Sequence, residues 1–133
     1  MRLFLDTNIF LDLLLQREYE KEALMILNSI SRGTHEGILL DITVVNIAYI
    51  ARKQGVDIEK FLKLILQNCY VVGGNNQMGL DALKLEHHDF EDALQYISAK
   101  ETACDVVVTN DKGFYIGDLE TMSSCVFVEK FIG

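Results

Sequence analysis

Short apolar runs alternate with stretches of helical repeat along the whole chain of 133 residues. A run of consecutive apolar positions is typical of a strand that is buried on both faces of a sheet. Such runs predict five strands, which are LFL at 3–5, GILLD at 37–41, CYVVG at 69–73, DVVVT at 105–109 and CVFVE at 125–129.

Between these runs, apolar residues recur at positions i, i+3, i+4 and i+7, which is the spacing of one buried helix face. Gly33 and Gly55 follow two of these stripes and predict helix ends, because glycine readily adopts the left-handed conformation of a C-terminal cap. The alternation predicts the fold class α/β, a three-layer α/β/α sandwich with a mostly parallel central sheet, in a single domain over 1–133. The stripes are Ala23, Ile26, Leu27 and Ile30; Val44, Ile47, Ala48 and Ala51; Ile58, Phe61, Leu62 and Ile65; and Phe90, Ala93, Leu94 and Ile97.

Composition places the chain among globular proteins, since 50% of its residues are hydrophobic and 24% are charged. No apolar run is long enough to span a bilayer, and the N-terminus lacks the features of a signal peptide. Cys69, Cys104 and Cys125 are odd in number and form no C-x-x-C, so we expect reduced, mostly buried thiols. These features predict a cytoplasmic protein with no membrane contact.

The charge balance limits what the chain can bind by itself. Twenty acidic residues against twelve Lys and Arg give a formal net charge of −8. Nucleic-acid binders usually carry the opposite sign, because Lys and Arg supply most non-specific affinity for phosphates. If the ligand is a polyanion, we therefore expect divalent metal ions or a basic partner protein to offset the acids locally.

Carboxylates stand where two of the predicted strands end. Asp6 follows the first strand and Asp111 follows the strand at 105–109. In parallel α/β sheets, ligands bind just beyond the carboxyl ends of the strands. Asp92 adjoins the apolar stripe of the last predicted helix, so we expect it to project toward the same edge of the sheet.

Convergence of Asp6, Asp92 and Asp111 would require a compensating charge. Two carboxylates about 4 Å apart repel by about 4 kcal/mol at an effective dielectric constant of 20. Oxygen ligands select hard ions, so the expected cofactor is Mg²⁺ or Mn²⁺. The same spacing is also compatible with three solvated carboxylates in turns, and the residues alone leave both interpretations open.

The residues around position 89 are typical of the start of a helix. Asp89 precedes a helical stripe and predicts an N-cap, which stabilises a helix by about 0.5–2 kcal/mol. His87 and His88 precede this cap, and we expect them to be solvated at the helix entrance.

Two sequence blocks resemble the PIN domain family, which includes the VapC-type toxins of bacterial toxin–antitoxin pairs. FLDTNIFLDLL is similar to the family's first motif, and DFEDALQYISAKETACDVVVTNDKGF is similar to its distal motifs, in the right order. The resemblance implies a PIN-like fold and a Mg²⁺- or Mn²⁺-dependent endoribonuclease. It further implies an RNA substrate, an antitoxin protein as partner, and compatibility with a homodimer.

Residue by residue, the resemblance assigns Asp6, Asp92 and Asp111 as acidic metal ligands and catalytic residues. Thr109 matches a hydroxyl that supports the site, and Asn8 matches a polar residue that braces the first loop. In this interpretation, the acids hold the ion, which helps a water to attack phosphorus.

The chain departs from the family pattern at the second acid. Where the family usually has Glu, early in the helix after the second strand, this chain has Asn46. Asparagine offers a carbonyl oxygen but no charge, so a second hypothesis is a weak or inactive PIN domain that binds RNA or a protein. Arg52, Lys53 and Lys112 are the bases expected to flank the site and contact RNA phosphates.

Overall fold

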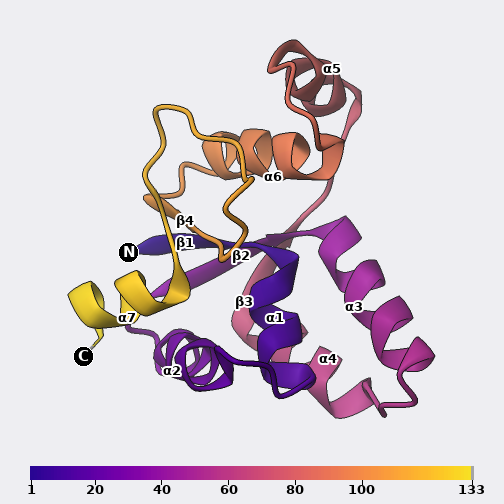
Figure 1. The fold of residues 1–133 in the computed structure, drawn as a ribbon, viewed down its shortest axis with the longest axis vertical. Coiled ribbons are helices and arrows are strands. Elements are labelled where there is room, and N and C mark those ends of the chain that lie inside the picture. The colour runs from indigo at the N-terminus through magenta and orange to yellow at the C-terminus, as the bar shows by residue number, and fades with distance from the viewer. Residues whose placement is uncertain (133) are drawn as a thin grey trace.

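A parallel sheet of five strands forms the centre of the structure, a computed structural model that describes residues 1–132 (Figure 1). The strand order is β3-β2-β1-β4-β5, and every neighbouring pair is parallel. The strands are β1 (Arg2–Leu5), β2 (Glu36–Leu40), β3 (Cys69–Val72), β4 (Val106–Val108) and β5 (Thr121–Met122).

Helices cover both faces of the sheet, which confirms the three-layer α/β/α sandwich. Figure 1 shows α5 and α6 on one side of the strands and the other helices on the opposite side. The helices are α1 (Thr7–Leu14), α2 (Glu20–Ser31), α3 (Asp41–Lys53), α4 (Glu59–Asn68), α5 (Asn76–Lys84), α6 (Phe90–Glu101) and α7 (Ser124–Phe131). Within residues 1–132, no helix has the length and apolar character that crossing a membrane requires.

The central strand β1 contributes to two hydrophobic cores because successive side chains point to opposite faces. Leu3 and Leu5 pack with α1, α2 and α7, whereas Phe4 packs with the layer of α5 and α6. All three side chains are fully buried. The run of consecutive apolar residues therefore predicted correctly that β1 is buried on both faces, since a strand covered on both faces has no polar side.

The predicted helix ends are also confirmed. Gly33 and Gly55 have φ angles of +79° and +72°, in the left-handed region, directly after the C-caps of α2 and α3. Two expectations about burial were wrong. Phe90 is 48% exposed although it belongs to an apolar stripe, and Cys125 is exposed, so not all three free thiols are sheltered.

The prediction of a strand at 125–129 was wrong, because this segment lies in helix α7. Ser123 is the N-cap of α7, and its side chain accepts a hydrogen bond from the Val126 backbone. The fifth strand is β5 instead, which pairs with β4 through Val107↔Thr121 and Val108↔Met122. A short apolar run can be a buried strand or one turn of a buried helix, and periodicity alone does not separate them.

The strand order creates the edge at which a ligand site is expected. From β1 the chain proceeds to β2 and β3 on one side and later returns to β4 and β5 on the other. The carboxyl ends of β1 and β4 are therefore neighbours at a topological switch point, where ligands bind in open α/β sheets.

The packing of α7 against the core can be tested by mutation. Phe127 on α7 is fully buried, whereas its neighbour Val126 is 38% exposed. We expect Phe127→Ala to lower the free energy of unfolding by about 3–5 kcal/mol, because it removes a large core side chain and leaves a cavity. Urea unfolding followed by circular dichroism measures this change. Val126→Ala is the matched control, and equal losses in both variants would contradict the docking of α7.

Candidate functional site

Asp6 lies at the end of β1, and its carboxylate is held between β4 and α6. Its backbone N–H donates to the Val108 carbonyl at 3.1 Å, which extends the ladder with β4. The Thr109 hydroxyl donates to Asp6 Oδ2 at 2.8 Å, and Gln95 Nε2 donates to Oδ1 at 3.0 Å. Asp6 is 2% exposed, and burial raises its pKa even though both hydrogen bonds act in the opposite direction.

Thr109 links Asp6 to Asp111 across the end of β4. While its hydroxyl donates to Asp6, the same oxygen accepts the backbone N–H of Asp111 at 3.0 Å. The Asp111 carboxylate accepts the N–H of Gly113 at 2.8 Å and is exposed to solvent. The two acids are 105 positions apart in the chain, but they lie close in space because β1 and β4 are adjacent strands. One hydroxyl thus fixes their relative position.

Asp92 comes from the first turn of α6 and is 5% exposed. Its Oδ2 is buried without a hydrogen-bond partner, and Nε2 of His87 lies 3.8 Å away from it. Burial raises the pKa of Asp92 to about 8, and the charges of Asp89, Asp6 and Asp111 add to this effect. A carboxylate in this position requires a proton or a cation.

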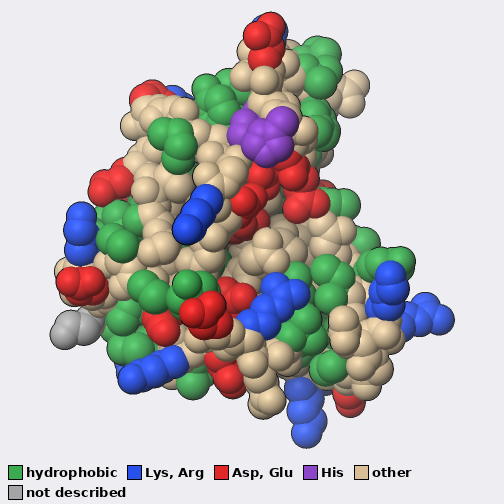
Figure 2. Space-filling model, viewed as in Figure 1, with side chains coloured by type: hydrophobic (Ala, Val, Ile, Leu, Met, Phe, Trp, Pro, Cys, Tyr) green, Lys and Arg blue, Asp and Glu red, His purple; other side chains and the backbone are tan. Residues whose placement is uncertain are grey.

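A fourth carboxylate, that of Glu91, lies beside this group. Asn46 Nδ2 on α3 donates to Glu91 Oε1 at 2.8 Å. Partial burial raises the pKa of Glu91, the Asn46 hydrogen bond lowers it, and the charges of Asp6 and Asp89 raise it. Figure 2 shows acidic side chains gathered in the middle of one face, directly beside the histidines.

The donor atoms at this edge suit a hard divalent ion. They are mainly carboxylate oxygens, and the Asp92 oxygen is buried and unpartnered. As they stand, however, no three Asp, Glu, His or Cys side chains within residues 1–132 form a set that could hold a metal ion. Repulsion between like charges favours such separation, so ion binding requires side-chain movement.

Comparison with known families identifies the fold. The sequence pattern described as the PIN domain matches residues 2–113. The chain belongs to the PIN domain family. The match covers both acidic strand ends, β1 with Asp6 and β4 with Asp111, and the whole of α6 between them.

Known proteins that are similar to this chain are distant in sequence but align over most of its length. Ribonuclease VapC1 of Aquifex aeolicus is 25% identical over 138 residues, which cover 98% of this chain and 95% of that protein. A toxin–antitoxin complex from Klebsiella pneumoniae contains a chain with TM-score 0.70 and 19% identity, covering 93% of this chain and 98% of that one. VapBC2 from Rickettsia felis, bound to a promoter DNA fragment, gives TM-score 0.68 at 16% identity, covering 92% and 98%. PAE2754 from Pyrobaculum aerophilum gives 0.67 at 17% identity, covering 97% and 88%.

The structure brings the three acids predicted as PIN domain ligands, and Thr109, to one edge of the sheet. Asp89 is the N-cap of α6, as predicted, and its side chain accepts the Asp92 backbone N–H at 3.1 Å. Asn8 lies nearby but is exposed, and it accepts a hydrogen bond from Arg17 at 3.2 Å. Next to Asn8, the Thr7 and Thr43 hydroxyls form a buried hydrogen bond of 2.9 Å.

The predicted basic residues are spread more widely. Lys112 is exposed next to Asp111. Arg52 and Lys53 form the last turn of α3, roughly 9 Å farther along the helix axis than Asn46 at 1.5 Å per residue. The structure therefore does not bring Arg52 and Lys53 into the acidic group.

Three side chains of the site were missed or misplaced by sequence analysis. Gln95 is fully buried and follows Asp92 by three residues, so the two share one face of α6, but Gln95 lies outside the apolar stripe and no sequence pattern marks it. Glu91 gave no signal beyond its place in the first turn. His87 was expected to be solvated, but its side chain is 13% exposed, because it packs against His88 and Tyr115.

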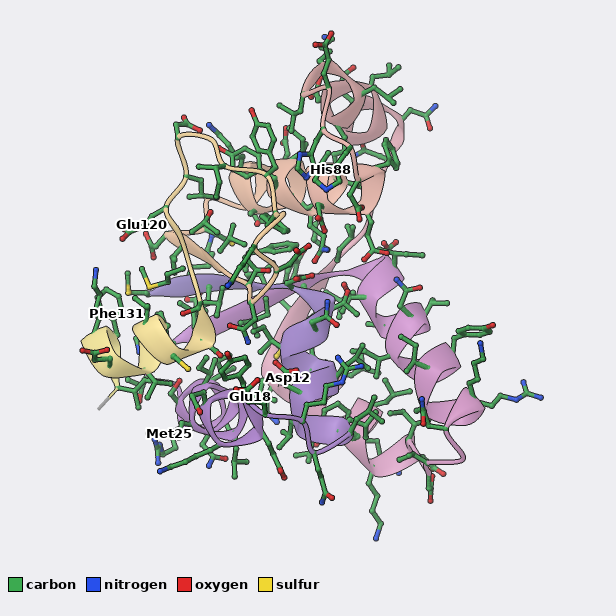
Figure 3. The ribbon with its side chains drawn as sticks, viewed as in Figure 1. Asp12, Glu18, Met25, His88, Glu120 and Phe131 are labelled. Carbon is green, nitrogen blue, oxygen red and sulfur yellow. The ribbon has the colours of Figure 1, made fainter. Side chains whose placement is uncertain are left out.

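A groove of about 460 Å³ leads away from Asp111 along α1, lined by Asn8, Asp12, Arg17, Glu18, Tyr19, Asn110 and Asp111. Asp12 is buried and accepts a hydrogen bond from Asn110 at 3.1 Å. Figure 3 labels Asp12 on α1, below the strands, and His88 near α6, above them. Arg17 gives this otherwise acidic groove a positive charge.

Asp92 gives the site a measurable pH dependence. Its ordinary pKa is 3.8, and in the folded chain it is about 8. Between these values the folded chain retains a proton that the unfolded chain has released, so the free energy of unfolding falls as the pH rises from about 4 through about 8. We expect Asp92→Asn to lack this loss, so that without metal its Tm exceeds that of wild type by several degrees at pH 9 but not at pH 4.

Differential scanning fluorimetry in EDTA across this pH range measures the effect. Asp57→Asn, which alters an exposed carboxylate on another part of the surface, is the control and should follow the wild-type curve. Parallel curves for Asp92→Asn and wild type would contradict the raised pKa of Asp92.

Proposed function

We propose that this PIN domain is a Mg²⁺- or Mn²⁺-dependent endoribonuclease and the toxin of a toxin–antitoxin pair. The observation that carries the proposal is the buried, unpartnered Oδ2 of Asp92 next to Asp6 and Asp111. Mutual repulsion of these acids is relieved by a divalent cation. The likeness to a relative named Ribonuclease VapC1 over almost the full length supports RNA as the substrate class.

In this proposal, Asp6, Asp92 and Asp111 hold the cation through carboxylate oxygens. A bound divalent ion supplies stabilisation of negative charge on a phosphodiester and lowers the pKa of water at the site. The protein contributes the positions of the acids: Thr109 and Gln95 each donate to one oxygen of Asp6, which fixes the orientation of its carboxylate. A fixed Asp6 carboxylate reduces the reorganisation that cleavage would otherwise require.

An RNA strand must approach a surface with net charge −8, so local positive charges matter. Lys112 adjoins Asp111, and Arg17 lines the groove that begins there. We assign contacts with RNA phosphates to these two residues first. Arg52 and Lys53, at the far end of α3, would contact only a longer strand.

Cleavage of a mixed-sequence single-stranded RNA tests the proposal. We expect cleavage by the purified protein with Mn²⁺ or Mg²⁺ and none in EDTA. Asp6→Asn should lower the rate by more than about 100-fold, because loss of residues that only support metal ligands already costs about 10–100-fold. The exposed Asp57→Asn variant is the matched control and should cleave as wild type does.

Absence of cleavage by wild type, in the presence of bound Mn²⁺ and with structured RNAs included, would favour the alternative of a binding module. Asn46 is the observation behind that alternative, since it brings no charge to the position where the family usually has Glu.

A separate surface supports the proposed antitoxin partner. An apolar groove of about 300 Å³ lies between α1, α2 and α4, and its wall includes Leu13, Leu14, Leu24, Leu27, Phe61 and Leu64. Leu24 and Leu64 are 45% and 58% exposed. We propose that an apolar helix of a basic antitoxin occupies this groove, because a positively charged partner complements the net charge of −8.

Co-expression with the product of a small gene encoded beside this one, where the genome has one, tests this partner. We expect the product to co-purify with wild type and to suppress cleavage, and Leu64→Asp to lose both effects. Leu83→Asp, which alters an equally exposed leucine on α5 across the sheet, is the control. Equal binding by both variants would contradict docking in the groove. If wild type alone sediments as a dimer that Leu64→Asp disrupts, the groove is a homodimer interface instead.

A further inference from the structure

Contact between α3 and α6 places an amide against a carboxylate at the rim of the acidic site. Asn46 Nδ2 donates to Glu91 Oε1 at 2.8 Å, and the two residues are 45 positions apart in the chain. Both side chains are half-buried. Within residues 1–132, no side chain or backbone N–H other than that of Asn46 donates a hydrogen bond to the Glu91 carboxylate.

The face of α3 that carries Asn46 points toward Asp6. Thr43 lies three residues before Asn46, so the two share one face of the helix. The Thr43 hydroxyl bonds to that of Thr7 at 2.9 Å, and Thr7 directly follows Asp6. This buried bond fixes the start of α3 against the loop of the first acid, and Asn46 occupies the next turn.

Glu91 is brought to the same place from the other layer of the sandwich. It directly precedes Asp92 in the first turn of α6, and Asp89, the N-cap, fixes the start of that turn. A glutamate in a first turn is ordinarily solvated, whereas the Glu91 carboxylate is turned to Asn46, and the charge of Asp6 acts on it.

We propose that Glu91 is the fourth carboxylate of the acidic site, and that Asn46 positions it. This inference rests on the proposed function of the same site as a metal centre. An amide at position 46 orients a carboxylate without adding charge. A glutamate there would instead face Glu91 with a like charge and repel it. Asn46 and Glu91 together thus supply one negative charge.

Direct titration with Mn²⁺, followed by the electron paramagnetic resonance signal of the free ion, tests this assignment apart from activity. We expect Glu91→Gln to weaken Mn²⁺ binding by about 10-fold or more, and Asn46→Ala to weaken it less. Because Asn46 acts through Glu91, the double variant Asn46→Ala/Glu91→Gln should bind no more weakly than Glu91→Gln alone. The exchanged variant, Asn46→Glu/Glu91→Gln, should recover most of the lost affinity.

Glu101→Gln is the matched control, since it removes an exposed glutamate from the last turn of the same helix and should bind Mn²⁺ as wild type does. Unchanged binding by Glu91→Gln, with loss of binding in Asp92→Asn, would overturn the role of Glu91 and leave the proposed function intact. Additive losses in Asn46→Ala and Glu91→Gln would overturn the positioning role of Asn46. If Asp6→Asn and Asp92→Asn also bind as wild type does, both this inference and the proposed metal centre are wrong.

Discussion

Burial of carboxylates without a cationic partner, at one edge of a sheet, is the constraint on which the rest of this structure depends. Asp6 and Asp92 are almost fully buried, and neither faces a Lys or Arg side chain at ion-pairing distance within residues 1–132. Burial of charge without a partner is costly, and here the cost appears as raised pKa values of both acids. Stability is thereby reduced at the place where a cation would restore it.

The fold tolerates this arrangement because its rigid elements fix the acids from several directions. The central strand β1 is covered by helices on both faces, and its carboxyl end meets that of β4. Thr109 and Gln95 each donate a hydrogen bond to the Asp6 carboxylate. Both donors are neutral, so they orient the carboxylate without cancelling its charge. Glu91 likewise has a neutral hydrogen-bond donor, the side-chain amide of Asn46. A site built from Lys or Arg partners would be more stable and less able to bind a cation.

The acids of the site were easier to predict from the sequence than the residues that support them. Asp6 and Asp111 follow buried strands, and the carboxyl ends of parallel strands share one edge, so their approach was predictable. Glu91, Gln95 and His87 were not predictable, because their neighbours come from other elements. Whether the first-turn glutamate of α6 faces solvent or a residue of α3 depends on how two layers of the sandwich pack, which no local pattern records.

The sequence by itself determined the α/β class, the first four strands, the helix ends at Gly33 and Gly55, and the N-cap Asp89. These features depend on periodicity and on backbone conformations that individual residues favour, and both are local properties. Only the tertiary structure decided that the run after Ser123 is the helix α7, and that Asn46 meets Glu91. Both outcomes depend on contacts between residues far apart in the chain, where the free energy of packing outweighs local preference.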